Sequence, residues 1–566
     1  MQKMKLDANN DPIMGIDLGT TNSAVAIYNA GTVPTLLPIG GPNKFTVQSC
    51  VKWEAPEMLG CKAWTVGEAA YEERYMPDVC YSVKRIMGSD QKIKFIDRYN
   101  PDHTLELTPS EVSSIILQHI KERVADLYCP ITKCVITVPA YFNQRQIEDT
   151  TAAAKMAGLN CLQILKEPTS ASYIYSQLGY AQNGSVLIYD LGGGTFDVTH
   201  MTFLRRDNIP KKLLTSLKQQ YGIELSSSTA DVNDQYFCRV LGTYGDMRLG
   251  GDDIDKALGD ALIERDSLGL SPQGTERLYL ECESFKKSGV YGMDLNIEGH
   301  RIHVTSADLD KAVDKIFDRT MYLISDVDFS DVKTIVLVGG STKSQRIRDN
   351  LAAAFPGVEI SAVLDPDATV ALGAGSVAKA IANNAELMYA DVLPLPIGVL
   401  VDEDHVEVCI PRNTSMPHTF SKDYHTLHDN QEAISIDVYQ GLSTSPKECT
   451  YLGRLRLANI PRAPAGEVVV NVSFMLNGQG LLKVISTIAD VDREEELVID
   501  NIFAVSNDAG STDIGSEAYL DEFEACFMPL LEGKDEAVTL FAARRMMISA
   551  GESTVEIEDQ IASLIV

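Results

Sequence analysis

Residues 13–27 read IMGIDLGTTNSAVAI, and residues 186–200 read VLIYDLGGGTFDVTH. In both segments an apolar run leads into Asp-Leu-Gly, small or hydroxyl residues follow, and a second strand-like run ends the unit. Such a strand-turn-strand unit exposes successive backbone N–H groups that suit phosphate oxygens, and glycine lets the phosphate come close to the backbone. Two copies of this unit predict two similar lobes that face each other across a cleft.

A single glycine-rich hairpin is more often an ordinary turn than a phosphate site. The duplication favours the phosphate site in this chain. The sequence contains no GxxxxGK[ST] loop, and no GxGxxG follows a predicted strand. Neither a P-loop nor a Rossmann-type nucleotide site is therefore indicated.

A third glycine turn lies at residues 334–342, TIVLVGGST, between an apolar strand and a helical stretch, KSQRIRDNLAAAF. Residues 138–158 and 365–382 carry alanine and glycine at helical spacing. Small residues let helices cross closely, which would suit crossings between the two lobes. For either segment alone, ordinary helix packing is the plainer explanation.

Composition limits the function classes. With 566 residues the chain is long enough for several domains, and its formal charge of -30, from 79 acidic and 49 basic residues, disfavours nucleic-acid binding. The sequence shows no secretory signal and no apolar run long enough to span a bilayer, so we expect no membrane partner. The 11 cysteines are scattered without a CxxC pair, which indicates reduced thiols and predicts a cytoplasmic protein.

The order of phosphate turn, connecting helix, second phosphate turn, adenosine turn and second connecting helix resembles the actin, hexokinase and DnaK superfamily. Several stretches resemble signatures of DnaK-type heat-shock chaperones, and in size and pattern the chain looks most like the short, specialised bacterial homologues. These stretches are GIDLGTTNS at 15–23, VPAYFN at 138–143, KEPTSAS at 166–172, DLGGGTFDV at 190–198, GDMRLGGDDID at 245–255 and VLVGGSTK at 336–343.

The resemblance implies an α/β two-lobed actin-like ATPase domain with ribonuclease-H-like duplicated lobes, then an all-β antiparallel sandwich and a short α-helical C-terminal segment. Period-two alternation in AISIDVY at 433–439 and VVVNVSF at 468–474 independently predicts the sandwich. The expected parts are an ATPase domain at 1–384 (lobe I about 13–184 plus 365–384, lobe II about 185–364), a linker at 385–395, a substrate-binding sandwich at 396–506 and a lid-like tail at 507–566.

ATP hydrolysis needs Mg²⁺ on the phosphates, a positioned water and donors for the transferring group. Asp17 and Asp190, one from each repeat, would hold Mg²⁺ through its waters, and Asp197 could take a proton from the attacking water. K⁺ is a further cation that the site would accept. The expected phosphate-turn residues are Gly19, Thr20, Thr21, Asn22, Gly192, Gly193, Gly194 and Thr195.

By resemblance, Lys84 in SVKRIMG matches the family's catalytic lysine and Glu167 in KEPT its catalytic glutamate. The family usually has arginine where Lys287 and Lys343 stand, and arginine stacks better on a purine, so we expect reduced nucleotide affinity. The residues that match the family's adenosine site are Gly250, Gly251, Glu283, Lys286, Lys287, Gly339, Gly340, Ser341, Lys343 and Asp367.

The sandwich and the linker also resemble the family. Asp391 matches the linker aspartate, but Tyr389 and Ala390 replace leucines, so we expect weaker coupling between nucleotide and peptide. Asp402 stands where the family usually has an apolar residue that arches over the peptide, which predicts a different substrate preference. The residues that match the peptide groove are Val399, Tyr424, Leu427, Ile434, Ile436 and Leu481.

Two segments depart from the family in length. A basic insertion around 203–236 replaces a short hairpin, and it is either a plain loop or a docking segment for a partner. The stretch from Asp255 to Glu283 is short in the subdomain that normally meets nucleotide-exchange factors, so use of an exchange factor stays open.

The function predicted is an ATP-dependent chaperone that binds extended apolar segments of unfolded clients and works with a J-domain cochaperone. The alternatives are a metabolite kinase, an actin-like filament former, and a chaperone homologue with weakened coupling or without hydrolysis. The sandwich disfavours the kinase and the filament, which do not need residues 391–505. A non-hydrolysing homologue is disfavoured because all the expected catalytic residues are present, namely Asp17, Lys84, Glu167, Asp190, Thr195 and Asp197.

Overall fold

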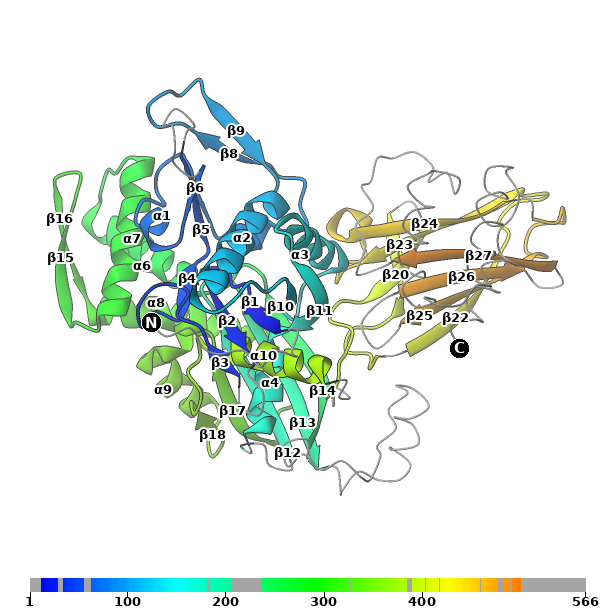
Figure 1. Ribbon diagram of the computed structural model, residues 1–566. Helices are drawn as coiled ribbons and strands as arrows, with labels where there is room; N and C mark the ends of the chain where they lie inside the picture. The colour runs from blue at the N-terminus through cyan, green and yellow to red at the C-terminus, as the bar shows by residue number, and fades with distance from the viewer. Residues whose placement is uncertain are drawn as a thin grey trace. The chain divides into compact units, whose positions relative to one another are not determined.

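Each copy of the repeated segment forms an antiparallel hairpin, β1 (Ile13–Asp17) with β2 (Asn22–Ile27) and β12 (Gly184–Leu191) with β13 (Phe196–Arg205). The structure is a computed structural model (Figure 1). It describes residues 12–28, 34–54, 63–178, 180, 184–205, 236–325, 327–383, 389–402, 404–416, 418–458, 460–476, 482–488 and 491–499.

The two hairpins belong to two six-stranded sheets with matching topology. The first runs β11-β10-β1-β2-β3, with β4 also paired to β2, and the second runs β18-β17-β12-β13-β14-β19. In each sheet the first hairpin strand pairs in parallel with a later strand, which pairs in parallel with the edge strand. The added strands are β3 (Thr35–Leu36), β4 (Thr46–Gln48), β10 (Lys133–Val138), β11 (Asn160–Lys166), β14 (Tyr236–Asp246), β17 (Val332–Val338), β18 (Glu359–Ser361) and β19 (Tyr389–Ala390). The repeat in the sequence is therefore a repeat of structure.

Two helices, α4 (Glu167–Gln177) and α10 (Thr369–Ala382), lie between the sheets (Figure 1). They share one apolar cluster with the inner face of the first sheet and another with the inner face of the second. The two helices cross closely, since a Cβ on Gly373 would lie 1.9 Å from the Ser170 carbonyl oxygen. The small residues of 365–382 thus form the close crossing that their spacing predicted.

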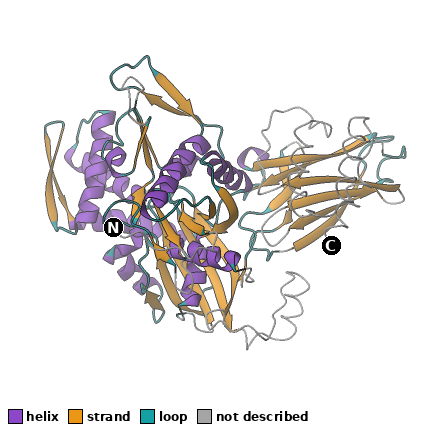
Figure 2. Ribbon diagram, viewed as in Figure 1, coloured by secondary structure: helices purple, strands orange, loops and turns teal. Residues whose placement is uncertain are grey.

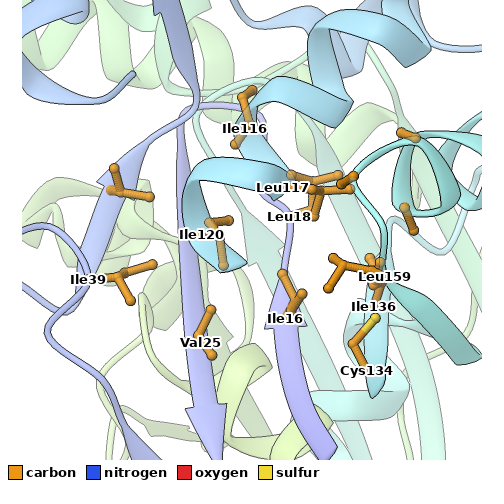
Figure 3. Close-up of a cluster of buried hydrophobic side chains, with 14 of the residues drawn as sticks. Ile16, Leu18, Val25, Ile39, Ile116, Leu117, Ile120, Cys134, Ile136 and Leu159 are labelled. Atoms are coloured by element: carbon orange, nitrogen blue, oxygen red, sulfur yellow. The ribbon is translucent and has the colours of Figure 1, made fainter. Parts of the chain in front are cut away.

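The outer faces of the sheets are covered by other helices. In the first lobe α2 (Pro109–Leu127) and α3 (Gln144–Met156) pack on the sheet, and Figure 3 shows Ile116, Leu117 and Ile120 of α2 against Ile16 and Val25. In the second lobe, the covering helices are α6 (Gly251–Asp266), α7 (Pro272–Ser288), α8 (Ser306–Tyr322) and α9 (Gln345–Ala354).

The segment 138–158 does not cross between the lobes as its composition suggested. Val138 ends β10, Pro139 follows, and α3 begins only after Asn143, whose side chain accepts from the Gln146 backbone N–H in a capping box. The helix packs on α2 and β11, on the outer face of the first sheet. Its alanines serve ordinary helix packing.

Smaller elements extend the two lobes. In the first lobe they are β5 (Cys50–Trp53), β6 (Trp64–Val66), α1 (Glu68–Tyr71), β7 (Val79–Tyr81), η1 (Val83–Ile86), β8 (Ile93–Ile96) and β9 (Thr104–Leu107). In the second they are β15 (Gly292–Ile297), β16 (His300–Thr305) and η3 (Gly340–Lys343). No helix among the described residues is long and apolar enough to cross a membrane.

Residues 397–499 form two four-stranded antiparallel sheets, β21-β20-β23-β24 and β22-β25-β26-β27. The strands are β20 (Ile397–Asp402), β21 (His405–Ile410), β22 (His418–His425), β23 (Ala433–Gln440), β24 (Thr450–Ala458), β25 (Val469–Leu476), β26 (Leu482–Ile488) and β27 (Val491–Ile499), with the short helix η4 (Pro446–Glu448). Buried residues alternate along β23 and β25 and meet in one core. Figure 2 shows that strands dominate this part of the chain.

The chain divides into two compact units, residues 1–504 and 505–566. The whole second unit lies outside the described residues, and so does the lid-like helical tail expected at 507–566. Of the insertion expected around 203–236, residues 206–235 lie outside the described residues, between β13 and β14.

Candidate active site

The two repeated turns meet. A Cβ on Gly193 would lie 1.9 Å from Thr21 Oγ1, and a Cβ on Gly194 would lie 2.3 Å from Thr20 Cγ2, so only glycine allows this approach. The turns are therefore in van der Waals contact, each at the end of its hairpin. Their backbone N–H groups lie where two lobes could hold one chain of phosphates.

Next to these turns, carboxyl groups from both repeats form a cluster with one lysine. Asp17 ends β1 and Asp190 lies near the end of β12, while Glu167 begins α4; all three side chains lie close enough to interact electrostatically. Lys84 Nζ donates to Glu167 Oε1 at 2.6 Å and to the Leu18 carbonyl oxygen at 2.5 Å. Both members of the Lys84–Glu167 pair are buried.

The local electrostatics disfavour ionised carboxylates in this cluster. Burial and the Glu167 carboxylate raise the pKa of Asp17 to about 7 and the pKa of Asp197 to about 8. Burial, together with the neighbouring carboxylates, raises the pKa of Asp190 well above its usual value. Burial, and the excess of carboxyl groups over the single Lys84 ammonium, thus both disfavour the ionised forms of these aspartates.

This donor set fits a hydrated divalent cation. Mg²⁺ prefers oxygen ligands and keeps several waters, so a few carboxylates at its periphery suffice. Among the described residues, no three His, Cys, Asp or Glu side chains are placed to ligate one metal ion together. Asp17 is fixed by the Thr137 hydroxyl, which donates to Asp17 Oδ1 at 3.0 Å.

The third glycine turn joins the same site. The Ser341 hydroxyl donates to the Gly192 carbonyl oxygen at 2.9 Å, and the Gly251 N–H donates to the same oxygen at 2.9 Å. Gly339 has φ of 80°, in the left-handed region, and a Cβ there would lie 2.4 Å from the Leu191 carbonyl oxygen. The structure thus brings the phosphate turns and the expected adenosine turn together.

The charged residues of the expected adenosine site are engaged with one another. Lys286 Nζ lies 2.7 Å from Asp255 Oδ2, and Lys287 Nζ lies 2.6 Å from Glu283 Oε1. Lys343 Nζ lies 2.6 Å from Asp367 Oδ2 and 2.8 Å from Asp365 Oδ1. The two lysines that replace arginine are therefore ion-paired with carboxylates in this structure.

Three further residues of the site were not predicted from the sequence. The Tyr71 hydroxyl donates to Glu283 at 3.0 Å, and Arg74 forms an ion pair with Glu283, so both link the first lobe to α7 of the second. Arg85 Nε donates to the Gly194 carbonyl oxygen at 2.8 Å. Arg85 directly follows Lys84 in SVKRIMG and could have been found from that motif, whereas no motif marks Tyr71 or Arg74.

The expected groove residues of the sandwich are only partly together. Val399, Ile434 and Ile436 are buried in the sandwich core, and Tyr424 packs against that core. Leu427 is 75% exposed and does not join them. Leu481 lies outside the described residues.

The linker aspartate contacts the first lobe. Lys166 Nζ lies 3.2 Å from Asp391 Oδ1 and donates to the Val392 carbonyl oxygen at 2.8 Å. Gln163 Nε2 lies 2.5 Å from the Tyr389 hydroxyl, and β19 pairs in parallel with β14. Of the two residues that replace leucines, Tyr389 thus has a hydrogen-bond partner that a leucine in its place could not use.

The paired lobes, the three turns and the buried charges at their junction define a two-lobed ATPase. The sequence model of the Hsp70 protein family matches residues 13–206 and 226–559. A chaperone protein HscA homolog from Pseudomonas paraeruginosa is 32% identical over 502 residues, which cover 83% of this chain and 75% of that protein. The chain belongs to the Hsp70 family, and it is an ATP-dependent chaperone with ATPase activity.

Proposed function

We propose that this chaperone hydrolyses ATP between the two lobes, with the phosphates held by the paired turns. The contact of Gly193 and Gly194 with Thr21 and Thr20 carries this proposal, because it joins the two repeats at one point. Asp17 and Asp190 lie directly behind that point, where a hydrated cation on the phosphates would sit. Bound Mg²⁺ would neutralise charge on the β and γ phosphates, and K⁺ is a further candidate cation.

Asp197 is the proposed acceptor of the proton from the attacking water. Its Oδ1 is buried and has no hydrogen-bond partner among the described residues, so a lone pair is free to accept. Since burial raises its pKa to about 8, this carboxyl group is largely protonated near neutral pH until a bound cation lowers that pKa, and only the ionised form accepts the proton. Lys84 would face the developing charge while it keeps Glu167 in place, and Thr195 would donate to phosphate.

The adenosine is proposed to lie against Gly339, Gly340 and Ser341, with Glu283, Lys286, Lys287 and Lys343 around it. The Nζ atoms of Lys287 and Lys343 each lie 2.6 Å from a carboxylate oxygen. The adenine base would therefore meet ammonium groups whose charge is already neutralised. An ammonium lacks the plane with which arginine stacks on a purine. We therefore expect the nucleotide to bind less tightly than it would to the corresponding double-arginine variant.

The sandwich is proposed to bind extended apolar peptide segments at Val399, Tyr424, Ile434 and Ile436, with Asp402 altering the preference. The linker would carry the nucleotide state to the sandwich through Asp391. A J-domain cochaperone is the expected partner, and the need for a nucleotide-exchange factor stays a question for experiment.

For the organisation of the chain we propose the boundaries expected from the sequence: residues 1–384 for the ATPase domain, 385–395 for the linker, 396–506 for the sandwich and 507–566 for the tail. No disulfide joins any of the cysteines that the structure describes. This supports a reducing compartment, and we propose the cytoplasm.

The test is the rate at which a fluorescent, extended apolar peptide leaves the full-length protein with ATP, with ADP and without nucleotide. Faster release with ATP is expected, and an Asp190→Asn variant should lose the acceleration because the cation site is damaged. The Lys155→Met variant, which changes an exposed lysine of α3, is the matched control. A release rate that ignores the nucleotide would contradict the proposed coupling, and hydrolysis without any peptide binding would contradict the proposed groove.

A further inference from the structure

Cys134 and Cys161 lie directly opposite each other on two neighbouring parallel strands, β10 and β11. Neighbouring strands are about 4.8 Å apart. A disulfide joins residues whose Cα atoms are about 4.4–6.8 Å apart. The two residues are therefore within disulfide reach with little movement of the backbone.

Both side chains point to the same face of the sheet. They belong to the apolar cluster beneath α2 and α3, in which Figure 3 shows Cys134 on the strand that also carries Ile136. Cys134 is fully buried, whereas Cys161 is only partly buried. The strand β11 is the edge of its sheet, and the register shifts directly after Cys161, with Leu162 as the extra residue. The edge and the bulge expose Cys161 more than its partner.

The two thiols are not equivalent. The Cys134 thiol donates to the Asn160 carbonyl oxygen at 3.7 Å, and the Cys161 thiol donates to the Gln163 carbonyl oxygen at 3.5 Å. The interaction between the two thiols lowers the pKa of Cys161, whereas this interaction and burial raise the pKa of Cys134. Cys161 is thus the better nucleophile and also the more accessible of the two. By contrast, burial raises the pKa of the Cys50, Cys80, Cys238 and Cys282 thiols, which disfavours their reaction.

We propose that Cys134 and Cys161 form a modification site, a dithiol that a two-electron oxidant of the peroxide class converts to an intramolecular disulfide. The Cys161 thiolate attacks one peroxide oxygen, the O–O bond breaks, and the leaving hydroxide takes a proton to become water. The resulting sulfenic acid is then attacked by the Cys134 sulfur, the S–O bond breaks, and a second water leaves with the Cys134 proton. Two thiols and one hydrogen peroxide thus give one disulfide and two waters.

The cross-link would act on the strand that contacts the linker. Gln163 and Lys166, on the same strand as Cys161, bind Tyr389 and Asp391. The disulfide ties β11 to β10 next to the bulge, so the strand that presents these two side chains can no longer move relative to β10. Oxidation should therefore lower the acceleration of peptide release by ATP. This consequence rests on the proposed coupling, whereas formation of the disulfide does not.

Tryptic mapping of the full-length protein tests the site. The protein is treated with hydrogen peroxide, alkylated and digested without reductant. Cys134 then lies in peptide 134–145, CVITVPAYFNQR, and Cys161 lies in peptide 156–166, MAGLNCLQILK. We expect a linked pair of these two peptides, two hydrogens lighter than their sum, which dithiothreitol separates. The pair should be absent from a Cys161→Ser variant and present in the Cys449→Ser control, whose cysteine lies in the sandwich.

Two outcomes would overturn the proposal. The first is complete alkylation of both cysteines in wild-type protein after the oxidant, which would show that they do not react. The second is linkage of either peptide to 124–133, VADLYCPITK, since Cys129 lies in the same apolar cluster. Both outcomes are read from the wild-type protein, so they do not depend on the folding of a variant. A disulfide that forms but leaves ATP-stimulated release unchanged would overturn the proposed effect on coupling alone.

Discussion

Lys84 holds its position through two short contacts, one to the Glu167 carboxylate and one to the Leu18 carbonyl oxygen. Its partners are buried, and Asp17 and Asp190 lie in the same cluster. Removal of the ammonium therefore leaves Glu167 unpaired beside two further acidic groups. Breaking a buried ion pair from one side is much more damaging than losing an exposed one.

The variant Lys84→Met should reduce ATP hydrolysis about 100-fold, the effect of losing one preorganised charge at a reacting centre. The free energy of unfolding of the first lobe should fall by about 3 kcal/mol, as for other broken buried pairs. Single-turnover hydrolysis and denaturant unfolding measure the two effects. The control is Lys44→Met, because the Lys44–Glu68 pair is exposed on both sides and should contribute less than about 1 kcal/mol. Equal effects of the two variants would contradict the role of Lys84.

We expect Asp255 to make the free energy of unfolding depend on pH. Burial raises its pKa to about 7, although Lys286 lies 2.7 Å away. The folded state keeps this proton up to about pH 7, whereas the unfolded chain releases it at the ordinary aspartate pKa of 3.8. The free energy of unfolding that the protonated Asp255 contributes is therefore lost as the pH rises between these two values. An Asp255→Asn variant should lose stability less steeply between about pH 5 and pH 8 in denaturant unfolding. Identical slopes for wild type and variant would show that Asp255 ionises normally.

At the scale of the element, the glycine hairpins could be predicted because their signals are local. A buried run, Asp-Leu-Gly and a second run fix a strand, a turn and a strand without any distant contact. The same holds for β23, whose buried residues alternate as AISIDVY does. By contrast, no local signal places Tyr71 and Arg74 beside Glu283, or Cys134 beside Cys161, because these contacts depend on how whole elements pack.

The expected groove residues show what the family resemblance cannot predict, namely the direction in which a side chain outside a strand points. Val399, Ile434 and Ile436 match family positions and do share one core, since alternation along the strands turns them inward. Leu427 follows β22 in a turn, where no strand alternation directs its side chain, and it is exposed. The resemblance thus picked out three residues that do share a core, but it could not orient a residue beyond the end of a strand.

The linker strand yields a prediction at this scale. Lys166 binds both Asp391 and the Val392 carbonyl oxygen, so it fixes the linker to the first lobe next to β19. A Lys166→Met variant should lose most of the acceleration of peptide release by ATP, a fall of about fivefold or more, given the usual size of coupling between two sites. Its basal release without nucleotide should change little. The exposed Lys155→Met variant provides the comparison, and an unchanged ATP response in Lys166→Met would show that the linker is held by other contacts.

For the whole molecule, the contact of Tyr71 and Arg74 with Glu283 ties the two lobes together beside the proposed adenosine site. In the proposed site, bound nucleotide has to leave from between these lobes. The contact therefore opposes release, because it must break whenever the lobes part.

An Arg74→Ala variant should release ADP several-fold faster than the wild type, measured with a fluorescent ADP in stopped flow. Arg346→Ala is the control for this contact, since Arg346 forms an ion pair with Asp314 within the second lobe and does not bridge the lobes. A similar acceleration in both variants would mean that the loss of an arginine, and not of the bridge between the lobes, speeds release.

The edge strands of the two large sheets determine whether unfolded chains can pair with the ATPase lobes of this chaperone. An exposed strand edge offers a row of free backbone hydrogen-bonding groups, on which an extended polypeptide can add itself as a further strand. Here the edge strands are very short, as in Thr35–Leu36, Glu359–Ser361 and Tyr389–Ala390, or bent by a bulge, as in β11 at Leu162. Short and bulged edges give an incoming chain little to pair with. The short and bulged edges thus make the ATPase lobes poor templates for the aggregation-prone segments that the sandwich is proposed to bind.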